Sequence, residues 1–165
     1  MALKDDLLKK DRPAVMFPIQ IKDPSKIQLT IADLEKQKRI LILAKKDTSV
    51  VDKKIANANR QLKKCFREIR LLSLEPAEYE KLVYENPPTV EQVKGKSIED
   101  VPLWDDSTFQ PALIAATAVD AGMTAEEWSE TIKSSFTAGE FRMLWAAVLG
   151  INNLPRQISA ALPKG

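Results

Sequence analysis

The hydrophobic residues in the second half of the chain recur every three or four positions, which is the period of an amphipathic helix. The pattern begins near Asp106 and is interrupted at Gly122 and Gly150. Glycine often ends helices because it adopts the left-handed backbone conformation at low cost. The pattern therefore predicts three short helices in series, over residues 106–119, 125–135 and 138–149.

The starts of these helices are marked by polar residues at fixed positions. Thr124 is followed three residues later by Glu127, and Thr137 is followed in the same way by Glu140. At this spacing the threonine oxygen and the glutamate carboxylate each accept a hydrogen bond from a free backbone N–H of the first turn. The two pairs predict where the second and third helices begin. Asp105-Asp106 predicts the start of the first, because an aspartate oxygen is a good N-cap acceptor.

The first half of the chain predicts two longer helices. One runs from Thr30 to Lys46, and the other runs from Ser49 to Leu72. Apolar residues of the second helix recur in steps of four and three, as in a coiled-coil seam, at Val51, Ile55, Ala58, Leu62, Cys65, Ile69 and Leu72. Because only a short turn separates the two helices, we expect an antiparallel helical hairpin.

The N-terminal 29 residues have a different pattern. Apolar residues at positions 15, 17, 19 and 21 alternate with others, which predicts a half-buried strand. Asp23-Pro24-Ser25 predicts a turn and Ile27-Gln28-Leu29 a second strand, so a small β-hairpin is expected here. Before it, residues 1–12 predict a short helix that Arg12-Pro13 ends, because the residue before a proline is disfavoured in a helix.

Together these elements predict a mainly α protein, in which an antiparallel helical hairpin precedes a compact bundle of short helices. A further short helix is expected from Pro76 to Glu85, since proline suits the first position of a helix. We divide the chain into an N-terminal arm with the β-hairpin, the charged helical hairpin plus the short helix, an acidic linker, the C-terminal helical bundle and a tail. Their bounds are residues 1–29, 30–86, 87–105, 106–152 and 153–165.

The composition limits the chemistry that the chain can perform. The 165 residues are 44% hydrophobic and 29% charged, as in a globular protein. Histidine is missing and Cys65 is the only cysteine, which removes the commonest general base and metal ligand and any internal disulfide. The glycine spacing matches neither a P-loop nor a dinucleotide-binding motif. We therefore expect no enzymatic activity, no catalytic or metal-binding residue and no cofactor.

Hydropathy argues against a membrane protein. No apolar run approaches the roughly 18–20 residues that span a bilayer. The first residues, Met1-Ala2-Leu3-Lys4-Asp5-Asp6, are charged where a secretion signal is apolar. The expected location is the cytoplasm.

Charge is distributed unevenly along the chain. Residues 30–72 contain twelve Lys or Arg against five Asp or Glu, whereas residues 75–140 contain four against fourteen. Such asymmetry favours self-association or a charged partner. The basic helices could follow the backbone of a nucleic acid, but the outer faces of helical hairpins are commonly charged. The last predicted helix also offers only Arg142 to read bases, so nucleic-acid binding is the less favoured interpretation.

Carboxylates cluster before the helical bundle. Asp105-Asp106, with Glu99-Asp100 nearby, contains the oxygen ligands that hard cations prefer. Two adjacent carboxylates before an apolar helix are more often a helix cap with a neighbour. We therefore favour the cap over a metal site.

Large apolar residues of the bundle have two interpretations. Most such residues form the core, but an exposed group of them would form a patch suited to a partner helix. On the second interpretation, the candidate partner-binding residues are Phe109, Leu113, Trp128, Phe141, Leu144, Trp145 and Val148.

The order of several segments between residues 30 and 152 resembles a known family. After the charged hairpin come Arg70-Leu71-Leu72-Ser73-Leu74, Glu78-Tyr79-Glu80-Lys81-Leu82, Asn86-Pro87-Pro88, an acidic loop and the helices of Phe109 to Asn152. This order resembles the small tail-assembly chaperone-type proteins of long-tailed bacteriophages that infect Gram-positive hosts. Family members often carry a histidine before the two prolines, where this chain has Asn86.

The resemblance implies a non-enzymatic protein without cofactors that binds the phage tape-measure protein in the host cytoplasm. Such chaperones keep that long, helical and apolar chain soluble until the tail tube assembles around it. Two other classes stay open. One is a structural virion component, such as a minor tail or head–tail connector protein, in which the two charged halves join neighbouring copies. The other is a helical nucleic-acid-binding regulator.

Overall fold

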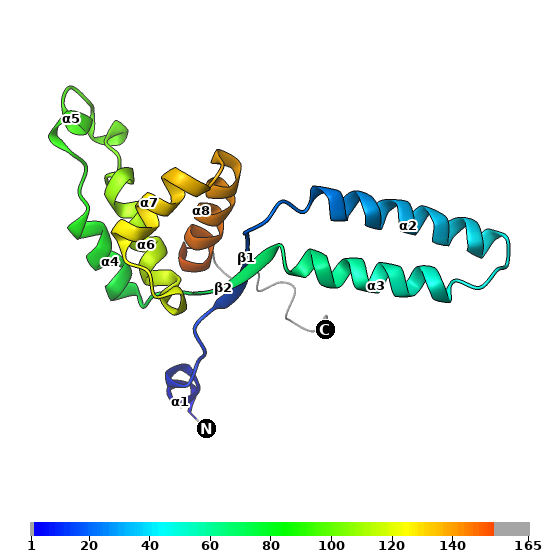
Figure 1. Ribbon diagram of the computed structural model, residues 1–165. Coiled ribbons are helices and arrows are strands. Elements are labelled where there is room, and N and C mark those ends of the chain that lie inside the picture. The colour runs from blue at the N-terminus through cyan, green and yellow to red at the C-terminus, as the bar shows by residue number, and fades with distance from the viewer. Residues whose placement is uncertain (1, 154–165) are drawn as a thin grey trace. The chain divides into compact units, whose positions relative to one another are not determined.

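The computed structural model describes residues 2–153. The protein is mainly α-helical and contains one two-stranded antiparallel sheet (Figure 1), which confirms the expected fold class. The tail was predicted for residues 153–165; Asn153 belongs instead to the last helix, and the remaining residues of the tail lie outside the described residues. The elements are α1 (Leu3–Leu8), β1 (Ala14–Gln20), α2 (Ser25–Leu43), α3 (Ser49–Lys63), β2 (Phe66–Leu72), α4 (Pro76–Glu85), α5 (Val90–Val93), η1 (Ile98–Asp100), α6 (Asp106–Thr117), η2 (Val119–Ala121), α7 (Ala125–Ser135) and α8 (Ala138–Asn153).

The chain folds as two compact units whose boundary runs through the strands. The hairpin unit is residues 18–69, and the bundle unit comprises the described residues up to 17 and from 70 onward. The hairpin unit contains thirteen basic and six acidic residues, whereas the described part of the bundle unit contains ten and seventeen. The segregation of charge seen in the sequence therefore follows the structural units.

The sheet pairs two strands that lie far apart in the sequence. The N–H of Ile21 donates to the carbonyl of Cys65 at 2.7 Å, and that of Ser73 donates to Pro13 at 2.9 Å. Hydrogen-bonded and non-bonded pairs alternate along an antiparallel ladder. With this register Pro18 falls at a non-bonded position, where its missing N–H costs no ladder hydrogen bond.

This pairing corrects two predictions. The predicted β-hairpin within residues 1–29 is wrong, because the strand partner is β2 and residues 27–29 are helical. The predicted helix from Ser49 to Leu72 is also wrong beyond Lys63, because residues 66–72 form β2. Cys65, Ile69 and Leu72 fit the spacing of a helix seam, but a short apolar run also fits a strand. Pairing with β1, which lies about fifty residues earlier in the chain, makes this segment a strand. A local sequence pattern contains no information about that partner.

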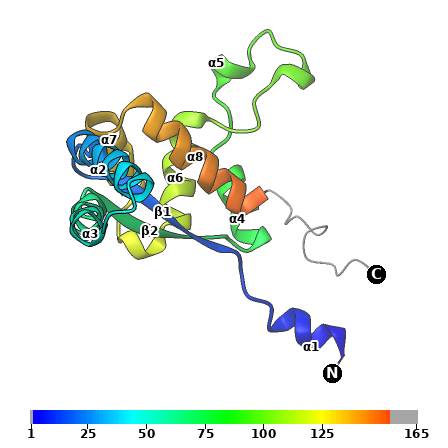
Figure 2. The same cartoon turned by 90° about the vertical axis from the view of Figure 1, so that its right-hand side faces the viewer.

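The hairpin unit contains the expected antiparallel pair of helices, α2 and α3, which lie side by side in Figure 1 and are seen nearly end-on in Figure 2. Their shared core is formed by Leu34, Val51 and Ala58, with Ile27, Ile31, Leu41 and Ile55 packed against it. Lys38 and Asp52 add an ion pair across the helices at 2.7 Å.

Helix α2 begins five residues earlier than predicted. The Asp23 carboxylate accepts hydrogen bonds from the backbone N–H of Ser25 at 3.0 Å and from its hydroxyl at 2.6 Å, which satisfies a free donor of the first turn. Thr30 lies inside the helix, where its hydroxyl donates to the Lys26 carbonyl at 3.0 Å. The segment Asp23-Pro24-Ser25, predicted as a turn before a strand, is instead the start of this helix.

The bundle unit is built around α6. Helix α6 packs against α4, α7 and α8, and its side chains Phe109, Leu113, Ile114 and Thr117 have no exposed surface. The predicted caps are confirmed. Thr124 with Glu127 and Thr137 with Glu140 form reciprocal hydrogen bonds of 2.7–3.2 Å, and the Asp105 side chain caps α6.

Candidate functional site

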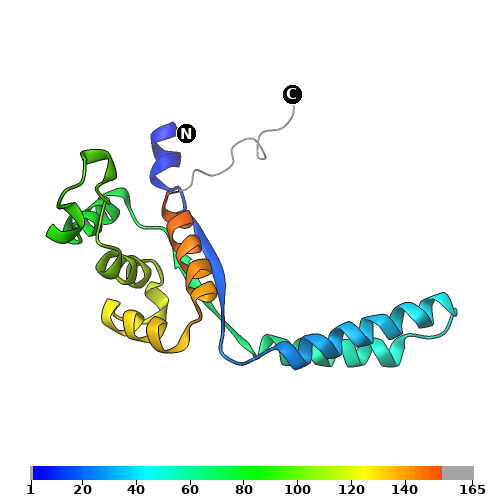
Figure 3. The same ribbon diagram turned by 90° about the horizontal axis from the view of Figure 1, so that it is seen from above.

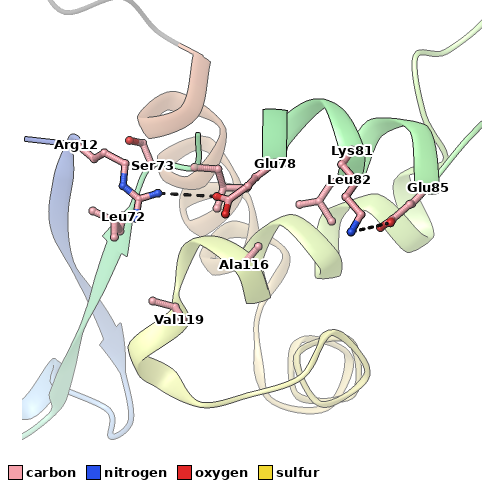
Figure 4. Close-up of a pocket in the computed structure, with 10 residues that line it drawn as sticks. Arg12, Leu72, Ser73, Glu78, Lys81, Leu82, Glu85, Ala116 and Val119 are labelled. Atoms are coloured by element: carbon pink, nitrogen blue, oxygen red, sulfur yellow. Dashed lines mark ion pairs between the residues drawn. The ribbon is translucent and has the colours of Figure 1, made fainter. Parts of the chain in front are cut away.

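The bundle unit carries a groove on its surface beside α4 and α6, which we call the α4 groove (Figure 4). It encloses about 360 Å³. Apolar side chains from the end of β2, the segment after it, α4, α6 and η2 form much of its lining: Leu72, Leu74, Leu82, Ala116 and Val119. Because Val119 is exposed and the other four are half-buried, the groove presents apolar surface to the solvent.

Charged residues surround this apolar surface. Arg12 forms an ion pair with Glu78 at 3.8 Å, and Lys81 forms one with Glu85 at 3.6 Å. Figure 4 marks both pairs among the groove residues. All four side chains are well exposed, so the two ion pairs contribute little to stability and exchange partners readily. An apolar strip bordered by charges of both signs matches an amphipathic segment, whose apolar stripe is also flanked by polar residues.

Asn152 fixes one edge of the groove through its side-chain amide. Its Oδ1 accepts a hydrogen bond from the backbone N–H of Leu74 at 2.8 Å. Its Nδ2 donates to the Thr117 hydroxyl at 3.0 Å and to the Val148 carbonyl at 2.9 Å. One amide therefore joins the segment after β2 to α6 and α8. This places Leu74 in the groove lining.

An aromatic cluster lies in the core next to α4. The Phe109 ring stacks on Trp104 with their centroids 4.2 Å apart, and it meets the rings of Tyr79 and Trp145 edge-on, each at 6.1 Å. Tyr79 belongs to α4 and Trp145 to α8. The cluster therefore holds these two helices on opposite flanks of α6 and sets the position of α4.

The residues predicted to bind a partner are largely in the core. Five are at most 2% exposed: Phe109, Leu113, Trp128, Leu144 and Val148. A side chain without exposed surface packs against its own chain, so these five are corrected to core residues. Phe141 and Trp145 are half-buried. Core residues and partner-binding residues produce the same apolar stripe on a helix. Only the burial of each side chain in the structure distinguishes the two roles.

Asp105 is the most densely hydrogen-bonded carboxylate of the bundle unit. Its Oδ1 accepts from the Ser107 hydroxyl at 2.9 Å, from the Ser107 N–H at 3.2 Å and from Gln92 Nε2 at 3.3 Å. Its own N–H donates to the Asn86 carbonyl at 3.0 Å. Asp105 thus ties α5 and the end of α4 to the start of α6. No cluster of three or more potential metal ligands occurs in residues 2–153.

The hydrogen bonds to Asp105 predict a pH dependence. The bond from the Ser107 side chain, more than the opposing effect of burial, lowers the pKa of this carboxyl below its ordinary value of 3.8. A lowered pKa in the folded state stabilises the protein above the unfolded pKa, and this contribution disappears as the pH falls through the folded value. Asp105→Asn keeps a cap acceptor but removes the charge. The variant should be less stable than wild type at pH 7.

Urea unfolding of both proteins between pH 7 and pH 3 measures this effect. We expect the difference in unfolding free energy to narrow as the solution becomes acidic. A difference that stays constant over the whole range would contradict the role given to the Asp105 charge.

Sequence reasoning missed the α4 groove and Asn152. Leu82 of α4 is half-buried and lines the groove. The groove joins residues 12, 72–85 and 116–119, and no local pattern links these segments. Asn152 lies in the last turn of α8, which continues through Gly150 past the end predicted at residue 149. Its hydrogen bond to Leu74, 78 positions earlier, has no signal in the sequence.

Comparison with known proteins adds nothing to this geometry. No protein-family model, curated protein or solved structure matches the chain. Among residues 2–153, no helix is long and apolar enough to cross a membrane.

Proposed function

We propose that this protein is a tail-assembly chaperone that binds apolar helical segments of a phage tape-measure protein and keeps them soluble in the host cytoplasm. The observation that supports this most is the α4 groove, an open apolar strip bordered by the Arg12–Glu78 and Lys81–Glu85 pairs. The order of segments that resembles such chaperones supports it as well. The proposed action is non-covalent and uses no cofactor.

The energetics favour weak binding by each copy. Complete burial of one leucine side chain stabilises a complex by about 1.5–3 kcal/mol, and the groove has room for a few side chains. Part of that gain is offset by the lost freedom of both partners. A long client offers many such segments, so several bound copies would cover it together while each copy dissociates quickly. Rapid exchange suits a chaperone that has to leave when the tail tube forms.

A substitution in the groove tests this proposal. Val119 lies in the groove and is exposed, so Val119→Glu should leave the fold intact and place a charge where an apolar client side chain would be buried. Burial of an unpaired charge is costly, so we expect at least about tenfold weaker binding. The measurement is the fluorescence anisotropy of a labelled helical fragment of the tape-measure protein, titrated with each variant.

Met143→Glu is the matched control, because Met143 is a similarly exposed apolar residue of the bundle unit and does not line the groove. It should bind as wild type does. If the two variants bound the labelled fragment with equal affinity, the client site would have to lie outside the α4 groove. Absence of saturable binding by the wild type would contradict the proposed function.

A second candidate function is nucleic-acid binding by the hairpin unit, favoured by its thirteen basic residues against six acidic ones. Binding to phosphates releases counterions, so it weakens steeply as salt rises. A gel shift with duplex DNA at low salt that disappears as salt is raised would support this function. Unshifted DNA at low salt would eliminate it.

A further inference from the structure

The end of the helical hairpin carries apolar residues that are largely exposed in the described chain. Ile40 and Leu43 lie three residues apart on α2, and so share a face, while Ile42 and Val50 flank the turn. Their exposed fractions are 64%, 84%, 56% and 65%, respectively. We call these four residues and the turn between them the hairpin tip. Figure 3 shows the turn where α2 passes into α3.

The turn itself is well defined. The Lys46 N–H donates to the Leu41 carbonyl at 2.9 Å and the Lys45 N–H to Ile42 at 3.0 Å. Lys45 has a φ of 53°, so the turn is a left-handed helix cap. Exposed basic residues surround the apolar ones: Arg39, Lys45, Lys46, Lys53 and Lys54. A ligand of the hairpin tip therefore has to be both apolar and acidic, and two tips would repel each other.

The bundle unit presents a surface of that kind. Between α4 and α6, the chain forms a loop that contains α5 and η1 and extends away from the helices of this unit (Figure 1). It exposes Val90, Ile98 and Leu103, of which Ile98 is 94% exposed. Residues 85–106 carry six acidic residues and two lysines. We call this segment the α5 loop.

The α5 loop is held in shape by its own hydrogen bonds. Thr89 and Gln92 form a reciprocal cap at 2.9 and 3.3 Å, and Gln92 also bonds to Asp105 at 3.3 Å. The Ser97 hydroxyl donates to Asp100 at 2.7 Å. A preorganised loop loses little conformational freedom when it binds.

We propose that the hairpin tip of one molecule docks on the α5 loop of a second copy of this chain. The apolar residues of the two surfaces cover one another, and the lysines of the tip face Glu91, Glu99 and Asp100 of the loop. The contact uses different surfaces on the two molecules, so each bound pair retains one free tip and one free loop. Such an interface extends into a ring or an open chain. The proposal does not depend on the client of the α4 groove.

Sedimentation velocity of the full chain over a range of concentrations tests the interface. The average mass of the sedimenting wild-type species should increase as the protein concentration rises. It should decrease at high salt, since salt screens exposed charges. The tip variant Ile42→Ser/Leu43→Ser and the loop variant Ile98→Ser/Leu103→Ser should each stay monomeric. Leu29→Ser is the control: Leu29 is 68% exposed on α2, at the opposite end from the tip, and this variant should associate as wild type does.

Mixing the two variants distinguishes this interface from others. The loop variant retains a tip and the tip variant retains a loop, so an equimolar mixture should form dimers and nothing larger. A mixture that stays monomeric while wild type associates would overturn the proposal, because an intact tip and an intact loop would then both be present without binding each other. The proposed interface would also be overturned if the average sedimenting mass of wild type did not depend on concentration, or if the tip variant associated as wild type does.

Discussion

Replacement of Phe109 by alanine is expected to lower the free energy of unfolding by about 3–5 kcal/mol. The ring is fully buried and contacts Trp104, Tyr79 and Trp145. Its removal leaves a cavity between three large rings, which are too rigid to close the space. The loss is comparable to the whole stability of many small domains, so the bundle unit should be partly unfolded at 37 °C.

Chemical denaturation followed by tryptophan fluorescence measures this loss, since Trp104 and Trp145 report on the cluster. Phe109→Leu fills much of the same volume and should destabilise far less. Tyr84→Ala is the surface control, because Tyr84 is 85% exposed on α4, and it should change stability by at most about 0.5 kcal/mol. An effect of Phe109→Ala no larger than that of Tyr84→Ala would mean that the cluster does not hold the bundle together.

Replacement of Asn152 by alanine should have the second large effect, a loss of about 1–3 kcal/mol. The substitution removes the acceptor of the Leu74 N–H and the donor to the fully buried Thr117. Polar groups left without a partner away from water are costly. Because Leu74 lines the α4 groove, binding of a client should weaken together with stability.

Two further variants test the Asn152 amide: one distinguishes its oxygen, which accepts, from its nitrogen, which donates, and the other is a control at the next residue. Asn152→Asp keeps an acceptor for Leu74 but loses both donors, so we expect intermediate stability at pH 7. Asn153→Ala is the neighbouring control: Asn153 is exposed and donates to Tyr79 at 3.1 Å, and its loss should cost less. Thermal unfolding of the variants ranks them, and equal stability of Asn152→Ala and Asn153→Ala would contradict the proposed role.

Local signals in the sequence predicted the bundle unit well. The pairs Thr124–Glu127 and Thr137–Glu140 identified the starts of α7 and α8, because a capping box depends on residues only three positions apart. The short helix predicted from Pro76 to Glu85 is observed with the same bounds as α4. These features depend only on residues within one helical turn of each other.

Features that depend on distant residues were not predictable from local patterns. Residues 66–72 are a strand because β1 pairs with them, and their apolar spacing alone fits a helix as well. The α4 groove likewise requires Arg12, Leu74 and Val119 to meet. Periodicity shows which face of a helix is apolar. It does not show whether another part of the same chain covers that face, so it predicts Trp128 and Val148 equally well as core residues and as partner-binding residues.

Coexpression with the tape-measure chain is the decisive measurement for the proposed chaperone. The quantity measured is the fraction of the tape-measure chain that remains in the supernatant after lysis and centrifugation, with wild type, with Val119→Glu and without this protein. We expect wild type to raise this fraction severalfold and Val119→Glu to raise it much less. Unchanged aggregation of the tape-measure chain, with folded wild-type protein in excess, would contradict the idea that this protein acts by covering apolar helices.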